Sequence, residues 1–101
     1  MEKKTPHTRL SVVQAMVKAG QVSSTKSADI GAVELGFPAP TLPDICNVLM
    51  ALTPADFYKS MTAYHDHTIW HEVYRPTYNG QQIYVKFIVT ANVVIVSFKE
   101  L

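Results

Sequence analysis

Two hydrophobic periodicities divide the chain. Up to about residue 52, apolar residues recur every three or four positions, which is the spacing of one face of an α-helix. From about residue 69 onward, β-branched and aromatic residues form three short runs separated by turn-forming residues, which is typical of strands. The pattern therefore predicts helices first and a sheet afterwards.

Three helices are predicted before residue 53. The first begins near Leu10, and Gly20 is its C-terminal cap. Ser27 is the predicted N-cap of the second helix, which ends at Gly36, and Asp44 is the N-cap of the third. The proline-rich segment FPAPTLP between these two helices is predicted to be an extended loop. The apolar faces consist of Leu10, Val13, Met16 and Val17 in the first helix, and of Ile45, Val48, Leu49 and Leu52 in the third.

A short fourth helix is predicted in the segment TPADFYKSMT. Thr53 suits an N-cap, Pro54 suits the first helical position, and Asp56 supplies the acidic residue that completes a capping box. The helix would run from Pro54 to about Met61 and present Lys59 on its surface, where a lysine is ordinarily a solvent-facing residue.

Three strand-like runs follow, namely IWHEVYRP, QQIYVKFIV and VVIVSFKEL. Asn79-Gly80 is a strong signal for a two-residue hairpin loop, and Ala91-Asn92 is a weaker one. Helices followed by strands indicate an α+β fold, with N-terminal helices packed on one face of a C-terminal antiparallel sheet. Because the chain has no internal repeat and no linker, residues 1–101 are predicted to form a single domain.

Two-residue loops would fix the register of this sheet and give it two different faces. On one face Tyr84 would lie opposite Lys99, with Arg75 opposite Tyr84 on the preceding strand. Pro76 lacks a ladder donor opposite Ile83, so its strand is expected to be an edge strand or to contain a bulge. Glu72 falls on the apolar face, so strand pairing is expected to end or shift before Glu72. The apolar face would contain the pairs Val85 with Phe98, Phe87 with Val96 and Val89 with Val94.

Composition and charge narrow the function classes. The 101 residues are 48% hydrophobic and 17% charged, which is typical of a globular domain and excludes a disordered chain. The formal net charge is only +1, so bulk charge does not argue for nucleic-acid binding, and any basic site must come from local placement. The single Cys46 cannot form an internal disulfide and lies in an apolar helix pattern, which favours a reducing cytoplasm and no nucleophilic cysteine. We find no stretch that predicts a signal peptide or a transmembrane helix.

The row of Arg75, Tyr84 and Lys99 is the first candidate for chemistry. Lysine is depleted in strands, and like charges gathered without a counter-ion cost stability. No carboxylate is predicted on this face. Two interpretations stand: a solvated face with edge-protecting lysines, or a site for an anion. Lys86, on the same face, is either a solvated or an RNA-contacting residue.

The stretch YHDHTIWH invites a metal interpretation, but its spacing matches no zinc motif, so a metal site is disfavoured. His65 and His67 are predicted loop residues, whereas His71 is a candidate because it falls on the face that carries the lysines. Among the aromatic residues, Trp70, Tyr74 and Phe98 are predicted to be core. Tyr58 and Tyr64 either pack or stack on bases.

Several segments closely resemble the MqsR toxins of bacterial toxin–antitoxin systems. They are MEKKTPHTRLS, KAGQV, CNV, DFYKSMT, DHTIW, VYRP, IYVK and VIVSFKE, and in this order they cover nearly the whole chain. The resemblance implies a RelE-like fold and a ribosome-independent endoribonuclease that cuts mRNA at short GC-containing sequences without a metal or other cofactor. It also implies a partner, the zinc-binding helix-turn-helix antitoxin MqsA, with operator DNA bound only through that complex.

The resemblance assigns functional positions one by one. The lysine of the DFYKSMT block is Lys59, the tyrosine of the IYVK block is Tyr84, and the lysine of VSFKE is Lys99. Arg75 is the arginine of VYRP. The family has a glutamine after its DHTIW block, and this chain has His71 instead, which either adds acid–base capacity or keeps a hydrogen bond. The proline-rich loop before Asp44 is longer than is usual in the family.

Metal-independent RNA cleavage requires a base for the ribose 2′-OH, cations for the phosphate oxygens and an acid for the departing 5′-oxygen. Arg75 suits the scissile phosphate because a guanidinium can bind two of its oxygens. Lys59 and Lys99 would hold adjacent phosphates or stabilise the transition state, and one of them could be an acid or base if neighbouring cations lowered its pKa. Tyr84 is a candidate base or 2′-OH-orienting group, with His71 as the alternative acid or base. A non-catalytic module that binds RNA or a protein through the same face is the alternative function.

Overall fold

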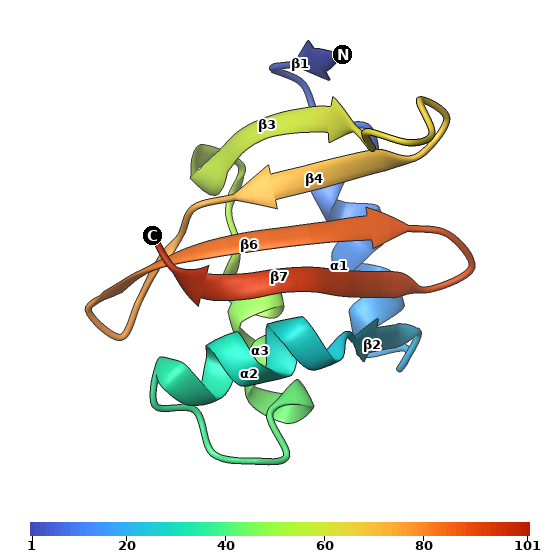
Figure 1. Cartoon of the computed structure of the whole chain (residues 1–101). Helices are drawn as coiled ribbons and strands as arrows, with labels where there is room; N and C mark the ends of the chain where they lie inside the picture. The colour runs from blue at the N-terminus through green and yellow to red at the C-terminus, as the bar shows by residue number, and fades with distance from the viewer.

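The computed structural model describes all 101 residues, and it contains three α-helices, one 3₁₀ turn and a seven-stranded, mostly antiparallel sheet. The spatial order of the strands is β1-β3-β4-β6-β7-β2, with the short β5 paired to β6 (Figure 1). The helices are α1 (Leu10–Lys18), α2 (Lys26–Glu34) and α3 (Leu42–Ala51), and η1 is the 3₁₀ turn Pro54–Asp56. The strands are β1 (Glu2–Lys3), β2 (Val22–Ser24), β3 (Phe57–Thr62), β4 (Trp70–Tyr74), β5 (Thr77–Tyr78), β6 (Gln81–Val89) and β7 (Val93–Glu100). The predicted α+β class is confirmed. No helix is long and apolar enough to cross a membrane.

The helices cover only one face of the sheet. Figure 1 shows α1 and α3 behind the strands, so that the face toward the viewer carries no helix. Helix α2 runs instead along β7, beyond the point where the short parallel strand β2 stops pairing with it. At Gly31 a side chain would place its Cβ 1.9 Å from the carbonyl oxygen of Phe98, so the helix approaches this strand closely because residue 31 has no side chain.

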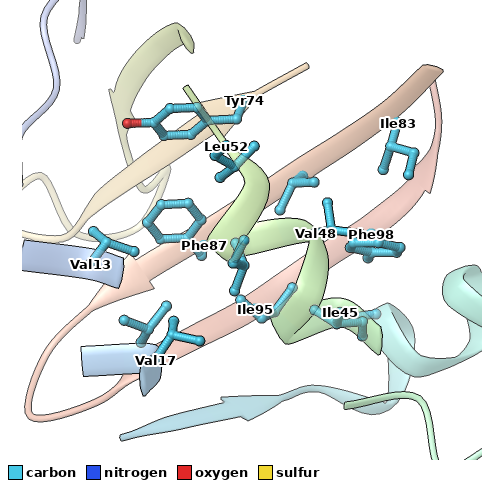
Figure 2. Packing of buried hydrophobic residues seen from close by; sticks show 14 of the residues in the cluster. Val13, Val17, Ile45, Val48, Leu52, Tyr74, Ile83, Phe87, Ile95 and Phe98 are labelled. Atoms are coloured by element: carbon cyan, nitrogen blue, oxygen red, sulfur yellow. The ribbon is translucent and has the colours of Figure 1, made fainter. Parts of the chain in front are cut away.

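The hydrophobic core lies between the covered face of the sheet and helices α1 and α3. Figure 2 shows Val13 and Val17 of α1 and Ile45 and Val48 of α3 in one cluster with Phe87, Ile95 and Phe98. The predicted apolar faces are confirmed in their central positions, whereas Leu10 and Met16 pack at the margin of the core. The strand residues that belong to this core are Tyr74, Ile83, Val85, Phe87, Val93, Ile95 and Phe98, and each is fully or almost fully buried.

The first hairpin has the predicted register. Asn79 and Gly80 have φ of +50° and +79°, as a two-residue hairpin loop of this type requires, and Tyr78 pairs with Gln81. The same register continues along β4, where Glu72 pairs with Phe87. The prediction that pairing ends or shifts before Glu72 is therefore wrong, and the reason is given with the site below.

The second hairpin departs from the predicted register halfway along. Near the C-terminus Tyr84 pairs with Lys99 and Lys86 with Ser97, as predicted, but a β-bulge follows Lys86, and Phe87 then pairs with Ile95. The connecting loop contains three residues instead of two, because Val89 pairs with Val93. As a result Val93 and Ile95 are buried, and Val94 and Val96, predicted for the core, are only half-buried.

The predicted fourth helix is wrong beyond its first turn. The capping box does form, with the Thr53 N–H donating to the Asp56 carboxylate at 2.8 Å, but it closes only the 3₁₀ turn. Residues 57–62 then form β3, because they are rich in aromatic and β-forming residues and pair with β4 on one side and β1 on the other. Tertiary pairing thus overrides the local helix-start signal.

Two helix N-caps also differ from prediction. The Thr25 hydroxyl, and not Ser27, accepts a hydrogen bond from the Ala28 N–H and begins α2. Helix α3 begins two residues before Asp44, with Pro43 in its first turn. These shifts are small, and the second helix ends as predicted, just before Gly36, which has φ of +96°.

Candidate functional site: the open face of the sheet

The sheet face opposite the helices carries most of the predicted site residues. We call it the open face, and its polar members are Glu2, Lys59, His71, Arg75, Tyr84, Lys86, Ser97 and Lys99. They share a face because opposed residues in neighbouring strands point the same way and residues two apart repeat that direction. Val73 is fully buried beneath this layer of long side chains.

Tyr84 and Lys99 form the best-defined pair on the open face. They lie directly opposite each other in β6 and β7, and the Lys99 ammonium is 5.2 Å from the centre of the Tyr84 ring. A cation at this distance is attracted by the π-electrons of the ring, although the pair remains accessible to solvent. The predicted juxtaposition of these two residues is therefore confirmed.

Arg75 lies in register with Tyr84 but turns toward another tyrosine. The Ile83 N–H donates to the Pro76 carbonyl, so the β4–β6 register continues through Arg75. Its guanidinium carbon is 3.8 Å from the centre of the Tyr58 ring, which is a stacking distance. Tyr58 lies at the register shift in β3, and this irregularity lets its side chain lie on the same face as that of Lys59.

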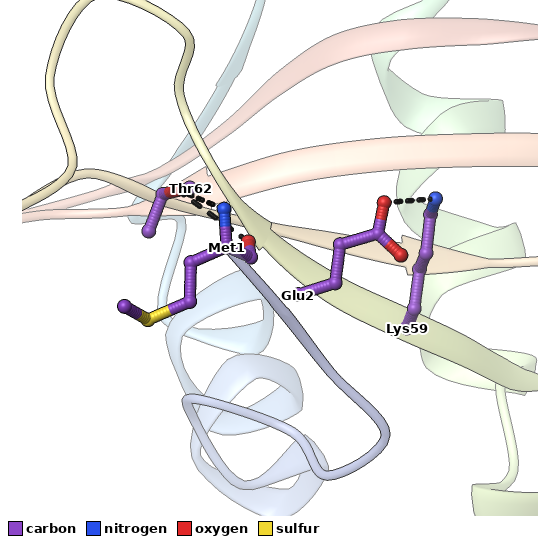
Figure 3. Close-up of polar contacts among 4 residues, drawn as sticks. All are labelled: Met1, Glu2, Lys59 and Thr62. Carbon is purple, nitrogen blue, oxygen red and sulfur yellow. Dashed lines mark hydrogen bonds and ion pairs between the residues drawn. The ribbon is translucent and has the colours of Figure 1, made fainter.

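Lys59 forms an ion pair that the sequence did not suggest. Its ammonium donates to the Glu2 carboxylate at 2.8 Å, and its side chain is 19% exposed (Figure 3). The hydrogen bond and charge of Glu2 raise the pKa of Lys59, with smaller contributions from Tyr58 and Tyr84. The prediction of a face without a carboxylate is therefore wrong, because β1 brings Glu2 to the open face. The condition under which Lys59 could be an acid or base, a lowered pKa, is not met.

His71 lies in a more sheltered part of the open face. Burial, followed by the charge of Lys86, lowers the pKa of His71 below its ordinary value, so the imidazole is neutral at neutral pH. Its Nδ1 atom is buried without a hydrogen-bond partner. A hollow of about 380 Å³ brings His71 together with Lys86, Tyr64 and His65. Tyr64 is 91% exposed there and its ring contacts that of His65 edge-on, so it is not a core residue.

Glu72 does not belong to the open face. It is buried on the covered side, where its carboxyl group accepts hydrogen bonds from the backbone N–H groups of His7 and Thr8 at 3.1 and 2.6 Å and from the Ser60 hydroxyl at 2.5 Å. These three donors satisfy a carboxyl group that an apolar face would otherwise exclude, which explains why strand pairing continues through Glu72.

The other polar residues of the YHDHTIWH stretch form no centre. The Asp66 carboxylate accepts hydrogen bonds from Thr68, which lower the pKa of Asp66 and close the loop. No group of three or more histidine, cysteine or acidic side chains is placed to hold a metal ion. Trp70, predicted to be core, is half-buried instead and stacks on His7, because the first eight residues and not a helix cover this end of the sheet.

Sequence reasoning missed the contribution of the first residues to the site. Glu2 and Lys4 both reach the open face. Glu2 forms the ion pair with Lys59, and the Lys4 ammonium lies 4.8 Å from the Tyr58 ring centre. Strand β1 is only two residues long, so no periodicity could reveal it. The charged EKK run was the only available signal.

A helical layer on one face of an antiparallel sheet, with tyrosine and basic residues gathered on the other, defines an α+β domain of the RelE-like toxin type. Residues 5–100 match the family model described as the motility quorum-sensing regulator, toxin of MqsA. The chain is also 55% identical over 100 residues to the mRNA interferase toxin MqsR of Escherichia coli (strain K12), covering 99% of both chains. The chain belongs to the MqsR toxin family.

Proposed function

We propose that the protein is an mRNA interferase toxin, an endoribonuclease that cleaves RNA on the open face of its sheet. The observation that carries this proposal is the pairing of Tyr84 with Lys99 on the same face as Lys59, Arg75 and His71. The face thus combines groups that exchange protons with cations that bind phosphate. Membership of the MqsR family supports the same activity.

The proposed reaction uses the 2′-OH of the RNA as nucleophile. A base removes the 2′-OH proton, O2′ forms a bond to phosphorus, and the bond from phosphorus to O5′ breaks. An acid then supplies a proton to O5′. The products are a 2′,3′-cyclic phosphate and a 5′-hydroxyl, and neither a metal nor an external co-reactant is consumed.

The cations of the open face stabilise the charge that develops on the phosphate. Arg75 is assigned to the scissile phosphate, because its planar guanidinium donates two parallel hydrogen bonds. Lys59 and Lys99 bind adjacent phosphate oxygens. The raised pKa of Lys59 keeps its ammonium charged, which suits a phosphate ligand and argues against a role as base.

Tyr84 and His71 are the proposed proton-exchanging groups. Tyr84 is next to Lys99 and serves as base or orients the 2′-OH. The lowered pKa of His71 leaves its imidazole neutral and able to accept a proton at neutral pH, which makes it the alternative base or, once protonated, the acid. The family glutamine at this position has no such capacity, so His71 gives this chain a proton-exchanging group that the family pattern lacks.

RNA flanking the cleaved bond is proposed to contact Lys86, Tyr58 and Tyr64. Lys86 and Tyr64 line the hollow next to His71, and the exposed Tyr64 ring offers a face for a base. Tyr58 already stacks on a guanidinium, as a base-binding tyrosine in a basic groove does. Cleavage at short GC-containing sequences, independent of ribosomes, is the specificity expected from the family.

The proposed protein partner is an antitoxin of the MqsA type, as the family description states for its members. We propose that this antitoxin carries a zinc-binding module and a helix-turn-helix domain, so that operator DNA is bound only through the complex. The expected compartment is the cytoplasm, where mRNA is translated.

The test is cleavage of a short synthetic RNA by purified protein in EDTA and without ribosomes. Tyr84→Phe and Lys99→Ala should each reduce kcat by about 10²–10⁴-fold, which is the usual contribution of one acid or base group. Lys18→Ala, in the exposed last turn of α1, is the matched control and should cleave like the wild type. Intact RNA with the wild type, or full activity in both variants, contradicts the proposal.

A non-catalytic binding module that uses the same cationic face is the second candidate. It predicts tight RNA or acidic-peptide binding with the RNA left intact. Growth arrest on expression that is relieved by Lys99→Ala, together with cleaved RNA, would exclude it.

A further inference from the structure

Three cations surround the ring of Tyr58, and they come from three separate parts of the chain. The Arg75 guanidinium carbon, the Lys4 ammonium and the Lys59 ammonium lie 3.8, 4.8 and 5.4 Å from the ring centre. Arg75 follows β4, Lys59 belongs to β3, and Lys4 follows β1. Only the last of these residues has no part in the function proposed above.

Lys3 of β1 and Lys4, which follows it, lie on opposite faces of the sheet. Glu2 pairs with Met61 and Lys3 with Ser60, so the register places Lys4 beside Lys59 on the open face. Lys3 points to the covered side, where its ammonium lies 4.3 Å from the Trp70 ring centre and 3.0 Å from Nδ1 of His7. The two neighbouring lysines therefore have the same charge and different surroundings.

The segment that carries Lys4 is held in place at several points. The amino group of Met1 donates to the Thr62 hydroxyl at 3.1 Å, and the Ser60 hydroxyl donates to the Thr5 carbonyl at 3.1 Å. The backbone N–H groups of His7 and Thr8 donate to Glu72. Lys4 therefore belongs to a segment whose backbone is held in place, so less conformational entropy is lost when it binds a ligand.

The charge around Tyr58 is not balanced within the protein. The ion pair between Lys59 and Glu2 is the single salt bridge of the molecule, and neither Lys4 nor Arg75 has an acidic partner within 4.0 Å. Cations gathered without a counter-ion repel one another, and an anion that bridges them removes this cost. The ring between them adds a flat apolar surface of the size of a nucleobase.

We propose that Lys4 and Tyr58 form a subsite for the nucleotide next to the cleaved bond, with Lys4 binding its backbone phosphate and Tyr58 stacking on its base. The subsite rests on the RNA-cleaving function proposed above and extends the RNA path from β3 onto the segment after β1. Arg75 lies over the same ring, so it connects this nucleotide to the scissile phosphate. Lys4 is a binding residue that acts on substrate affinity and not on the chemical step.

The first test compares Lys4→Gln with its matched control Lys3→Gln on a short RNA. Lys4→Gln should raise KM by about threefold to tenfold at unchanged kcat, as expected for one lost charge-assisted contact. The slope of log affinity against log salt concentration should fall by about 0.7, the value for one phosphate contact to a single strand. Lys3→Gln should leave KM, kcat and the salt slope unchanged. Lys4→Arg, which keeps the positive charge, should bind RNA like the wild type.

The second test locates the phosphate. Single neutral methylphosphonate linkages are placed one at a time along the RNA, and binding is measured by fluorescence anisotropy. One position should weaken binding by the wild type and leave binding by Lys4→Gln unaffected. If Lys3→Gln and Lys4→Gln lose affinity equally, or every linkage affects wild type and Lys4→Gln alike, the subsite is wrong while RNA cleavage stands. If the wild type neither binds nor cleaves RNA, the proposed function itself fails.

Discussion

The two faces of the sheet are made by the same strands and have opposite chemistry. On the covered face Val85, Phe87 and Phe98 are fully or almost fully buried against the helices. On the open face the intervening residues Tyr84, Lys86 and Lys99 remain accessible. Alternation along each strand therefore lets one short segment of sequence build both the core and the candidate active site.

Two glutamates, one on each face, differ in their partners. Glu72 on the covered face is satisfied by two backbone N–H groups and a hydroxyl, without a cation. Glu2 on the open face is exposed and paired with Lys59, whose hydrogen bond and charge lower the pKa of Glu2. The comparison separates a carboxyl group that holds the fold together from one that modulates the electrostatics of the site.

The largest expected difference comes from replacing two neighbouring residues that lie on opposite faces of the sheet. Phe87→Ala should lower the free energy of unfolding by about 3–5 kcal/mol, because it leaves a cavity in the core. Lys86→Ala should change it by no more than about 0.5 kcal/mol and weaken RNA binding instead. Urea unfolding and RNA binding of both variants test this. If Phe87→Ala does not fold, Phe87→Leu should still lose more stability than Lys86→Ala, and the reverse order would contradict the assignment of faces.

The buried glutamate should contribute the next largest effect. Glu72→Gln keeps the shape of the side chain but sets an amide N–H group among three donors, so we expect a loss of about 1–3 kcal/mol in unfolding free energy. Glu100→Gln, at the exposed end of β7, is the control and should be neutral. Because Glu72 anchors residues 7 and 8, the variant should also expose amides of the first strand to faster hydrogen exchange. Unchanged stability would show that the carboxyl group is not required.

His71 should make stability depend on pH. Its pKa is lowered in the folded protein from the ordinary 6.5, so the unfolded chain binds a proton more readily. The contribution of His71 to stability is fully present above about pH 6.5 and is lost as the pH falls through the lower folded pKa. As the pH falls from about 7.5 to 5, the thermal unfolding midpoint should therefore decrease more steeply for the wild type than for His71→Gln.

The same pair of proteins tests the role of His71 in cleavage. If His71 is the base, the acid limb of the kcat profile should lie below pH 6.5 in the wild type and should disappear in His71→Gln. Identical profiles would leave Tyr84 as the base.

The smallest expected effect comes from Glu2. Glu2→Gln removes the negative charge beside Lys59, so RNA should bind about twofold more tightly at low salt, and this gain should fade as salt screens the site. Thermal stability should not change, because exposed ion pairs contribute little. Glu34→Gln at the exposed end of α2 is the control. Weaker RNA binding by Glu2→Gln would mean that Glu2 serves to position Lys59.

The sequence was sufficient where a local signal sets long-range geometry. The Asn79-Gly80 loop fixes the β5–β6 register, which then carries through Tyr74 with Val85. Tyr84 lies opposite Lys99 as predicted, although that prediction assumed a two-residue second loop, because the bulge after Lys86 offsets the third loop residue. Family resemblance, and not charge or composition, supplied the catalytic interpretation of these residues.

Other features have no local signal. The bulge between Lys86 and Phe87 changes which of Val93 to Val96 are buried, yet both registers place valine or isoleucine on each face. Residues 53–56 carry a genuine helix start, and only pairing with two other strands makes residues 57–62 a strand, β3. The ion pair with Glu2 joins residues 57 positions apart, a distance over which sequence spacing carries no information.

The close packing of α2 on β7 connects a helix outside the candidate active site to the strand that carries Lys99. A methyl group at residue 31 would overlap the carbonyl of Phe98, and the next residue along that strand is Lys99. Gly31→Ala would therefore move the backbone that carries a candidate catalytic lysine, although residue 31 belongs to a helix with no part in the site. In a genetic selection for survivors of toxin expression, substitutions at Gly31 should be recovered beside those at Lys99, and they would be misread as folding defects unless the purified variants were assayed.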